Sequence, residues 1–331
     1  MTETGFRALS RGPVFHEKEI VTQMKPNTRK LLAKLAMAFC AFCWGVSFVV
    51  VKDTTSQIQT NMILVFRYMI SAVAIGLFCT GKFRSTKYQE VLFGGVVGAI
   101  SYFAMYLQTG GLVHTTPGKS AFLTAAYCVF VPFITWIWDR KRPQLKHFAA
   151  AVLCLIGIGF IALQESFTMN IGDVMTIGCA IIFALTFVMI DKWYAKIDLA
   201  RVTFFQMLVT GIVALAFVFF TKESCPALNG RAVFSVLYLS LIATALCMFL
   251  QNLVQRFIDP SSTALICSLE SVFAALASVI LIHERPTPKQ LTGFVIVFSA
   301  VVLSQLEMKK KEPADGKGEE NGPDEASDHG V

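Results

Sequence analysis

The stretch Met105-Tyr106-Leu107-Gln108 returns 143 positions later as Met248-Phe249-Leu250-Gln251. The match continues without a gap, and its further identities are Pro117 over Pro260, Ala121 over Ala264, Val129-Phe130 over Val272-Phe273, Arg142-Pro143 over Arg285-Pro286 and Lys146 over Lys289. Earlier in the two halves the shift is 139, which places Ser47-Phe48 over Thr186-Phe187 and Phe66-Arg67 over Phe205-Gln206. This self-similarity predicts a chain made of two related halves.

The composition of the chain indicates that lipid is its solvent. Of 331 residues, 55% are hydrophobic and 15% are charged, and the mean hydropathy is +0.60, whereas a soluble domain is usually about 25% charged. The net charge of +7 does not indicate a nucleic-acid partner, because the positive residues flank apolar segments. Most of the nine cysteines lie inside apolar segments, so neither a disulfide framework nor a metal site is expected.

Ten apolar segments are long enough to cross a bilayer, which takes about 20 residues of helix. They cover residues 31–51, 61–80, 88–110, 117–138, 146–163, 171–190, 199–220, 233–255, 260–283 and 288–307. We therefore expect an all-α integral membrane protein of ten transmembrane helices. Residues 31–165 and 171–307 are its two expected five-helix repeats.

Lys and Arg residues are distributed unequally, since every second loop is basic. One side of the membrane receives 22 of the 29 Lys and Arg residues and the other side receives six. The positive-inside rule then places both termini in the cytoplasm, which requires an even number of spans. Residues 1–30 form a polar tail without the apolar core of a signal peptide. Residues 308–331 are polar, and we expect them to be a disordered cytoplasmic tail.

An odd number of spans in each repeat turns the second copy upside down relative to the first. Inverted repeats of this kind occur in many secondary transporters, with the substrate site at the repeat interface near the middle of the bilayer. The two copies can exchange conformations and so open a central site first to one side and then to the other. The repeat thus predicts transport of a small molecule through a lipid membrane.

Three stretches resemble the drug/metabolite transporter superfamily, in particular its EamA-type members. They are Trp44–Phe48, Pro117–Pro143 and Leu269–Leu276, the last of which leads to His283-Glu284-Arg285. The resemblance extends over nearly all of residues 31–307. It implies ten helices, a central substrate cavity and the export or exchange of small metabolites, without implying one substrate. We expect a multi-pass protein of the plasma membrane, which is the inner membrane if the source is bacterial.

The chain departs from the family pattern at one position of the third stretch. Family members often carry proline directly after the glutamate, whereas this chain has Ser271. We therefore expect its ninth helix to be less kinked. The acidic residue that follows this helix, Glu284, matches the family pattern, and the equivalent residue of the first repeat is Lys141.

Glu270 is the carboxylate that we place deepest in a span, about ten residues, or about 15 Å, from the start of its helix. A buried acid is costly in a membrane and often marks a substrate or proton path. Coupling of transport to protons through Glu270 is therefore one interpretation. The alternative is a structural acid that is hydrogen-bonded to neighbouring helices.

Arg67 is the base that we place deepest in a span. Its guanidinium group could bind an anionic group of the substrate, such as a carboxylate, through two hydrogen bonds. It could instead neutralise Glu270 in a structural pair, or extend toward the nearer membrane face. The repeat counterpart Gln206 is also polar, which favours a position facing the protein interior.

Further candidates for substrate contact are polar or aromatic residues inside the spans. They are Trp44, Ser47, Tyr102, Tyr106, Gln108, Tyr127, Thr186, Gln206 and Gln251. Hydrogen bonds between helices explain the glutamines as well as ligand contact does. The aromatic residues are also typical of packing or of the membrane interface, and the hydroxyl groups can bond to their own helix backbone. Gly94 and Gly98 predict close helix packing inside the protein.

Three classes of function compete for this sequence. We favour a secondary transporter that exports or exchanges amino acids or related solutes, with nucleotide sugars and drugs as alternative substrate classes. A non-transporting membrane scaffold or receptor is the second class. An enzyme is not indicated, because none of the five histidines lies in the middle of a span. No cofactor is expected either, since Val113 replaces the first glycine of a phosphate-binding loop at Gly118-Lys119-Ser120. The sequence leaves the oligomeric state open.

Overall fold

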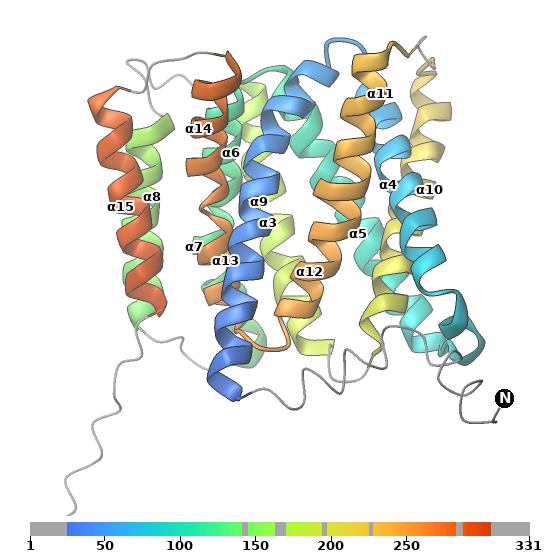
Figure 1. The fold of residues 1–331 in the computed structure, drawn as a ribbon, viewed down its shortest axis with the longest axis horizontal. Helices are drawn as coiled ribbons and strands as arrows, with labels where there is room; N and C mark the ends of the chain where they lie inside the picture. Colours follow the sequence, from blue (N-terminus) through green and yellow to red (C-terminus); the bar gives the residue numbers. More distant parts are fainter. Residues whose placement is uncertain are drawn as a thin grey trace, which may run out of the picture.

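The computed structural model describes residues 25–140, 145–162, 170–193, 197–224, 228–282 and 287–305. Within these ranges every regular element is a helix, as Figure 1 shows. In chain order they are α3 (Pro26–Thr54), α4 (Thr60–Phe78), the 3-10 helix η1 (Thr80–Ser85), α5 (Tyr88–Val113), α6 (Pro117–Ala125), α7 (Tyr127–Asp139), α8 (Leu145–Ala162), α9 (Ile171–Trp193), α10 (Leu199–Thr221), α11 (Gly230–Leu237), the π-helix η3 (Tyr238–Leu246), α12 (Cys247–Val254), α13 (Pro260–Cys267), α14 (Glu270–Ile282) and α15 (Pro288–Gln305). The Arg-Pro pairs of the repeat, Lys141, Glu284 and the expected tail 308–331 lie outside the described residues. Helix α3 already begins within the expected tail 1–30.

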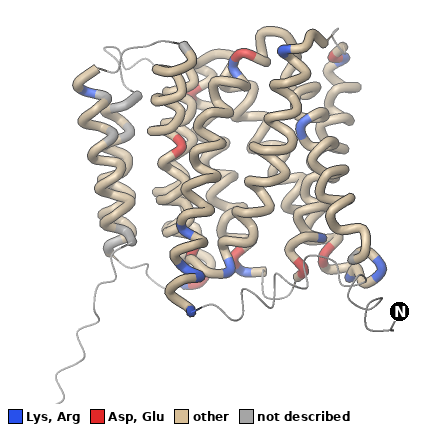
Figure 2. The backbone as a smooth tube through the Cα atoms, viewed as in Figure 1, with Lys and Arg blue, Asp and Glu red and all other residues tan. Residues whose placement is uncertain are grey.

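Helices occupy all ten segments that the sequence predicts as spans. Eight helical segments in the described ranges are long and apolar enough to cross a membrane. In the other two, α8 and α15, the apolar helical stretches His147–Gly157 and Leu291–Leu303 are shorter. Charged residues gather at the two ends of the bundle and leave its middle almost free of charge, as Figure 2 shows. The protein is therefore a multi-pass membrane protein. We call the end at which α3 begins the lower end and the opposite one the upper end.

The contacts between helices follow a regular plan. Helices α8 and α15 pack against each other at one edge of the bundle (Figure 1). Helices α4 and α10 also pack on each other. Other principal contacts form related pairs. Helix α3 packs on α14 as α9 packs on α7, and α4 packs on η3 as α10 packs on α5. The ten predicted spans explain these pairs. If each helix of one contact is replaced by the helix at the corresponding place in the other half of the chain, the other contact of the pair results.

Two of the expected spans are interrupted near their middle. The segment 117–138 consists of α6 and α7, which are separated at Ala126, and the segment 260–283 consists of α13 and α14, which are separated at residues 268–269. The expectation of a less kinked ninth helix is therefore wrong. Figure 1 shows α6 and α14 in the upper half of the bundle and α7 and α13 in the lower half.

Serine side chains explain the second interruption without a proline. Ser268 Oγ donates a hydrogen bond to the carbonyl oxygen of Leu265 at 2.7 Å, and Ser271 Oγ donates to that of Ser268 at 2.7 Å. Carbonyl groups at the interruption thus have serine hydroxyl groups as hydrogen-bond partners. Glu270 consequently lies at the first residue of α14, and not within one continuous helix.

The π-helix η3 interrupts a third span and turns carbonyl groups toward α3 and α4. Trp44 Nε1 donates to the carbonyl oxygen of Ala243 at 2.7 Å, and Ser71 Oγ donates to that of Ser240 at 2.7 Å. A π-helical turn is wider than an α-helical one and is frequent at functional sites. Here it ties α3 and α4 to one segment of the second half of the chain.

Two glycines of α5 allow its close contact with α10. A Cβ atom on Gly94 would lie 2.7 Å from Phe205 Cβ, and one on Gly98 would lie 2.6 Å from the carbonyl oxygen of Gln206. The predicted close packing inside the protein is therefore confirmed.

Gly45 on α3 lies against the start of α14 without room for a side chain, and this yields a first test. A Cβ atom at residue 45 would lie 2.5 Å from Phe273 Cβ and 2.8 Å from the carbonyl oxygen of Glu270. We expect Gly45→Ala to destabilise the fold by about 1–3 kcal/mol, because two backbones must move apart. The midpoint of thermal unfolding in detergent should fall. Gly118→Ala is the control, since a Cβ atom at Gly118 meets nothing within 4 Å. Equal midpoints for the two variants would contradict this packing.

Candidate functional site

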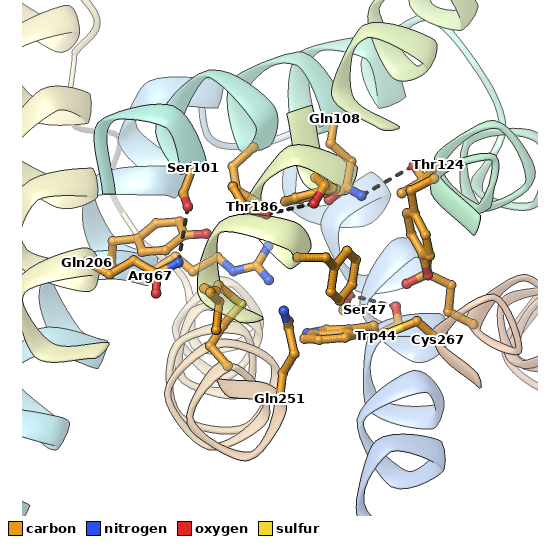
Figure 3. Close-up of a pocket in the computed structure, with 18 of the residues that line it drawn as sticks. Trp44, Ser47, Arg67, Ser101, Gln108, Thr124, Thr186, Gln206, Gln251 and Cys267 are labelled. Atoms are coloured by element: carbon orange, nitrogen blue, oxygen red, sulfur yellow. Dashed lines mark hydrogen bonds between the residues drawn. The ribbon is translucent and has the colours of Figure 1, made fainter. Parts of the chain in front are cut away.

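A cavity lies near the middle of the bundle, and residues of both interrupted spans and of α12 line it. About 640 Å³ of space free of protein atoms lies in and at the mouth of this cavity, including space that is open to the surroundings. Its lining is polar at several points and otherwise aromatic or aliphatic, as Figure 3 shows. The lining residues are Trp44, Ser47, Phe48, Arg67, Tyr68, Ser101, Met105, Gln108, Thr124, Tyr127, Phe183, Thr186, Phe187, Ile190, Gln206, Met248, Gln251, Cys267 and Glu270.

Sixteen of these 19 residues form eight pairs that are related by the sequence shifts of 139 and 143. The pairs are Trp44 with Phe183, Ser47 with Thr186, Phe48 with Phe187, Arg67 with Gln206, Met105 with Met248, Gln108 with Gln251, Thr124 with Cys267 and Tyr127 with Glu270. Each half of the chain thus contributes almost the same set of positions. The cavity lies on the boundary between the halves.

Arg67 forms the basic region of the cavity. The residue belongs to α4 and is 5% exposed. Its Nε atom donates a hydrogen bond to Thr244 Oγ1 on η3, which is the one side-chain hydrogen bond of Arg67 among the described residues. The two terminal nitrogens of the guanidinium group are therefore left for a ligand. Figure 3 shows the group directed toward the middle of the cavity.

Glu270 forms the acidic region of the cavity and is 4% exposed. Tyr127 Oη donates a hydrogen bond to Glu270 Oε1 at 2.9 Å. The two residues begin α14 and α7, directly after the two helix interruptions. They are also counterparts in the repeat. This bond therefore joins the two halves of the chain at equivalent positions.

Arg67 and Glu270 do not neutralise each other. Each makes its hydrogen bond with a different neighbour, and no ion pair within 4.0 Å joins them in the described part of the chain. The structural pair considered from the sequence is therefore not formed. The cavity has separate basic and acidic regions, one between α4 and η3 and the other between α7 and α14.

Three glutamines line the cavity, and they differ in the hydrogen bonds that their side-chain amides make. Gln206 Nε2 donates to Ser101 Oγ at 3.1 Å, and Gln108 Nε2 donates to Thr124 Oγ1 at 3.4 Å, both of which Figure 3 marks. Gln251 is 5% exposed, and its amide makes no hydrogen bond within the ranges that the structure describes. Its amide and the Arg67 guanidinium are the polar groups best placed to receive a ligand.

The hydroxyl and indole candidates also line the cavity but are bonded to helix backbone. Ser47 Oγ donates to the carbonyl oxygen of Trp44 at 2.7 Å, and Thr186 Oγ1 donates to that of Phe183 at 2.8 Å. The indole of Trp44 is held by η3, so its ring has a fixed orientation at the cavity wall. The two hydroxyl oxygens can still accept a hydrogen bond from a ligand.

Tyr102 and Tyr106, which the sequence also suggested for substrate contact, do not line this cavity. Tyr102 is 1% exposed, stacks on Phe217 with ring centroids 5.0 Å apart, and donates from Oη to Asn61 Oδ1 at 2.8 Å. Tyr106 stacks on Tyr102, with centroids 5.9 Å apart. On α5 the lining residues are Ser101, Met105 and Gln108, so the tyrosines lie on the adjacent helix face.

Most lining residues that the sequence assignment missed are apolar. Met105, Met248, Phe48 and Phe187 carry no charge or polarity that would single them out inside a span. The repeat alignment itself contains a signal for them, since each is the counterpart of another lining residue.

A bundle of membrane-length helices that encloses a polar cavity at mid-depth is typical of membrane transporters. The chain belongs to the EamA-like transporter family, whose family model matches it twice, over residues 31–163 and 170–306.

Similar proteins carry names of the same kind. An "Uncharacterized transporter" of Archaeoglobus fulgidus is 28% identical over 280 residues, which is 85% of this chain and 88% of that protein. The "Uncharacterized transporter YvbV" of Bacillus subtilis is 22% identical over 295 residues, or 87% of this chain and 95% of that protein. A solved crystal structure aligns with a TM-score of 0.68 at 14% identity, covering 82% of this chain and 96% of that chain. This last likeness concerns the fold alone.

Proposed function

We propose that the protein is a secondary transporter in which two inverted five-helix repeats, residues 31–165 and 171–307, give alternating access to the central cavity. The observation that carries this proposal is the pairing of the lining, since eight pairs of repeat counterparts surround one space. Such pairing is expected where two copies of one unit face each other across a pseudo-two-fold axis in the membrane plane. The double match of the family model and the related helix contacts also support it.

The proposal includes ten membrane crossings with both termini in the cytoplasm. Helices α8 and α15 count as crossings because they pack against each other as repeat counterparts beside the other eight spans. The excess of Lys and Arg in every second loop supports a cytoplasmic lower end. The membrane would be the plasma membrane, or the inner membrane of a bacterium.

The separate basic and acidic regions of the cavity favour a zwitterionic solute, such as an amino acid or a related metabolite. A carboxylate can receive two hydrogen bonds from the terminal nitrogens of Arg67, and the free amide of Gln251 can assist. An ammonium group can bind at Glu270. Trp44, Phe187 and Met248 supply apolar surface for the remainder of the solute. Export or exchange is the proposed direction, and Glu270 is the proposed site of any coupling to protons.

Transport by reconstituted protein tests the proposal. Purified protein in proteoliposomes should move a labelled amino acid, and unlabelled zwitterions should compete better than the matching amines or carboxylic acids alone. The measurement is repeated with and without a pH gradient, because proton coupling through Glu270 requires a response to the gradient. If no labelled metabolite moves faster than through protein-free vesicles, a scaffold or receptor becomes the better interpretation.

A further inference from the structure

Buried amide side chains continue from the cavity toward the lower end of the bundle, between α10 and α12. Asn252 and Gln255 are 1% and 2% exposed and do not line the cavity. Asn252 Nδ2 donates to Thr203 Oγ1 at 2.9 Å and to Gln206 Oε1 at 3.3 Å. Since Gln206 lines the cavity, this group is connected directly to the proposed transport site.

The hydrogen bonds determine the orientation of both amides. Gln255 Nε2 donates at 2.8 Å to the carbonyl oxygen of Phe187, which can only accept. Thr203 Oγ1 donates its own proton to the carbonyl oxygen of Leu199 at 2.8 Å, so it can only accept from Asn252. In both amides the NH₂ group therefore makes the hydrogen bonds, and the oxygen atom has no donor among the described residues.

Both free oxygens are buried without a donor. Asn252 Oδ1 and Gln255 Oε1 have no hydrogen-bond partner within the described ranges. Buried polar atoms in native proteins almost always have a partner, which can be water or an ion. Two orphaned acceptors, one on α12 and the other at the residue that follows it, thus call for a ligand that donates hydrogen bonds or carries positive charge.

The upper half of the bundle has no equivalent of this group. The repeat counterparts of Thr203, Asn252 and Gln255 are Leu64, Thr109 and Leu112, which are buried and mostly apolar. The amides are therefore not a general requirement for packing these two helices together. They make the region below the cavity chemically different from the equivalent region above it.

We propose that Asn252 Oδ1 and Gln255 Oε1 form a cation subsite, separate from the central cavity, which binds one small monovalent positive charge. The charge is either Na⁺ or the ammonium group of the transported solute, since both are bound by neutral amide oxygens. The C-terminal end of α12 adds the negative end of a helix dipole at the same place. Only the second ligand depends on the proposed transport function.

Carboxylates lie one helical turn further toward the lower end. Asp191 follows Phe187 by one turn of α9, and Asp259 is close enough to Asp191 to interact with it electrostatically. Lys192 Nζ lies 3.4 Å from Asp191 Oδ2 and 2.6 Å from Asp139 Oδ2, so one lysine is shared by two of these three acids.

Cation-dependent stability tests the subsite independently of transport. We would measure thermal unfolding of the purified full-length protein in lipid nanodiscs while NaCl or methylammonium chloride replaces the chloride salt of a bulky organic cation at constant ionic strength. The unfolding midpoint of the wild type should rise with Na⁺, with methylammonium or with both, and the rise should saturate. A response to Na⁺ alone identifies the free ion, and a response to methylammonium identifies the ammonium group.

Three variants give the assay its specificity. Gln255→Met keeps the side-chain size, removes one oxygen and should raise the half-saturating cation concentration about tenfold or more. Asn252→Asp keeps the shape and adds a negative charge, but it also replaces the Nδ2 donor to Thr203 Oγ1 and Gln206 Oε1 with an oxygen. It should still lower that concentration about tenfold, an outcome that a misfolded variant cannot give. Thr109→Val, the repeat counterpart in the upper half, should leave it unchanged.

The inference is overturned if neither cation stabilises the wild type, since water alone would then satisfy the oxygens. It is also overturned if Gln255→Met and Asn252→Asp respond like the wild type. Saturable cation binding without any solute flux would sustain the subsite and reject the proposed transport. Solute flux without cation binding would support the proposed transport and reject the cation subsite.

Discussion

Replacing Arg67 with glutamine should lower the transport of a carboxylate-bearing solute about 100-fold. In this variant both counterpart positions, 67 and 206, carry glutamine. The change removes the guanidinium group, whose terminal nitrogens have no protein partner in the described structure. Loss of one member of a buried charge pair costs about 2–5 kcal/mol, and each 1.4 kcal/mol is about tenfold. Initial rates in proteoliposomes, corrected for the amount of inserted protein, measure the effect.

Arg231→Gln is the matched control for this prediction. It removes the same charge, but Arg231 is 74% exposed on its side chain, bonds to Asp53 and does not line the cavity. Its transport rate should stay within about twofold of the wild type, because exposed ion pairs contribute about 0–1 kcal/mol. Arg67→Lys should give an intermediate rate, since lysine keeps the charge and loses the paired geometry. If Arg67→Gln and Arg231→Gln transport equally well, Arg67 does not contact the solute.

Replacing Glu270 with glutamine should lower transport of a zwitterion about 10- to 100-fold. The variant keeps the size of the side chain and removes the charge that we assign to the ammonium group of the solute. Tyr127→Phe, which deletes only the donor to Glu270 Oε1, should cost about fivefold, as for one ordinary hydrogen bond of about 1 kcal/mol. The double variant should be no slower than Glu270→Gln alone, because both changes act on one group.

A solute without an amino group provides the control for Glu270. Its carboxylate still meets Arg67, so its transport should be far less sensitive to Glu270→Gln than transport of the zwitterion. An equal loss for both solutes would assign Glu270 to the helix junction and not to solute binding. An abolished response to a pH gradient in Glu270→Gln would add a role in proton coupling.

The repeat is the part of the sequence that carries most information about the cavity. Glu270, Arg67 and the glutamines stand out because polar groups are rare inside spans, and nine of the eleven candidate residues line the cavity. Alignment of the halves also predicts that a lining residue has a lining counterpart, as Met105 has Met248.

The helix interruptions and the two tyrosines could not be derived in the same way. The interruption before Glu270 depends on serine hydroxyl groups that replace lost backbone hydrogen bonds, and serine is equally common in continuous membrane helices. The exclusion of Tyr102 depends on a partner, Asn61, that belongs to another helix. A single helix shows which residues share a face, but its rotation within a bundle is decided by all of its neighbours.

The bond between Tyr127 and Glu270 has a consequence for how such a protein can arise. If the two halves descend from one ancestor that worked as an antiparallel dimer, these positions were once the same residue on both copies. Two tyrosines would lack the carboxylate acceptor of this bond, and two ionised glutamates would lack its hydroxyl donor. In that case the bond arose only after the two copies had diverged in sequence. The exchanged variant Tyr127→Glu with Glu270→Tyr should rebuild it in mirror order.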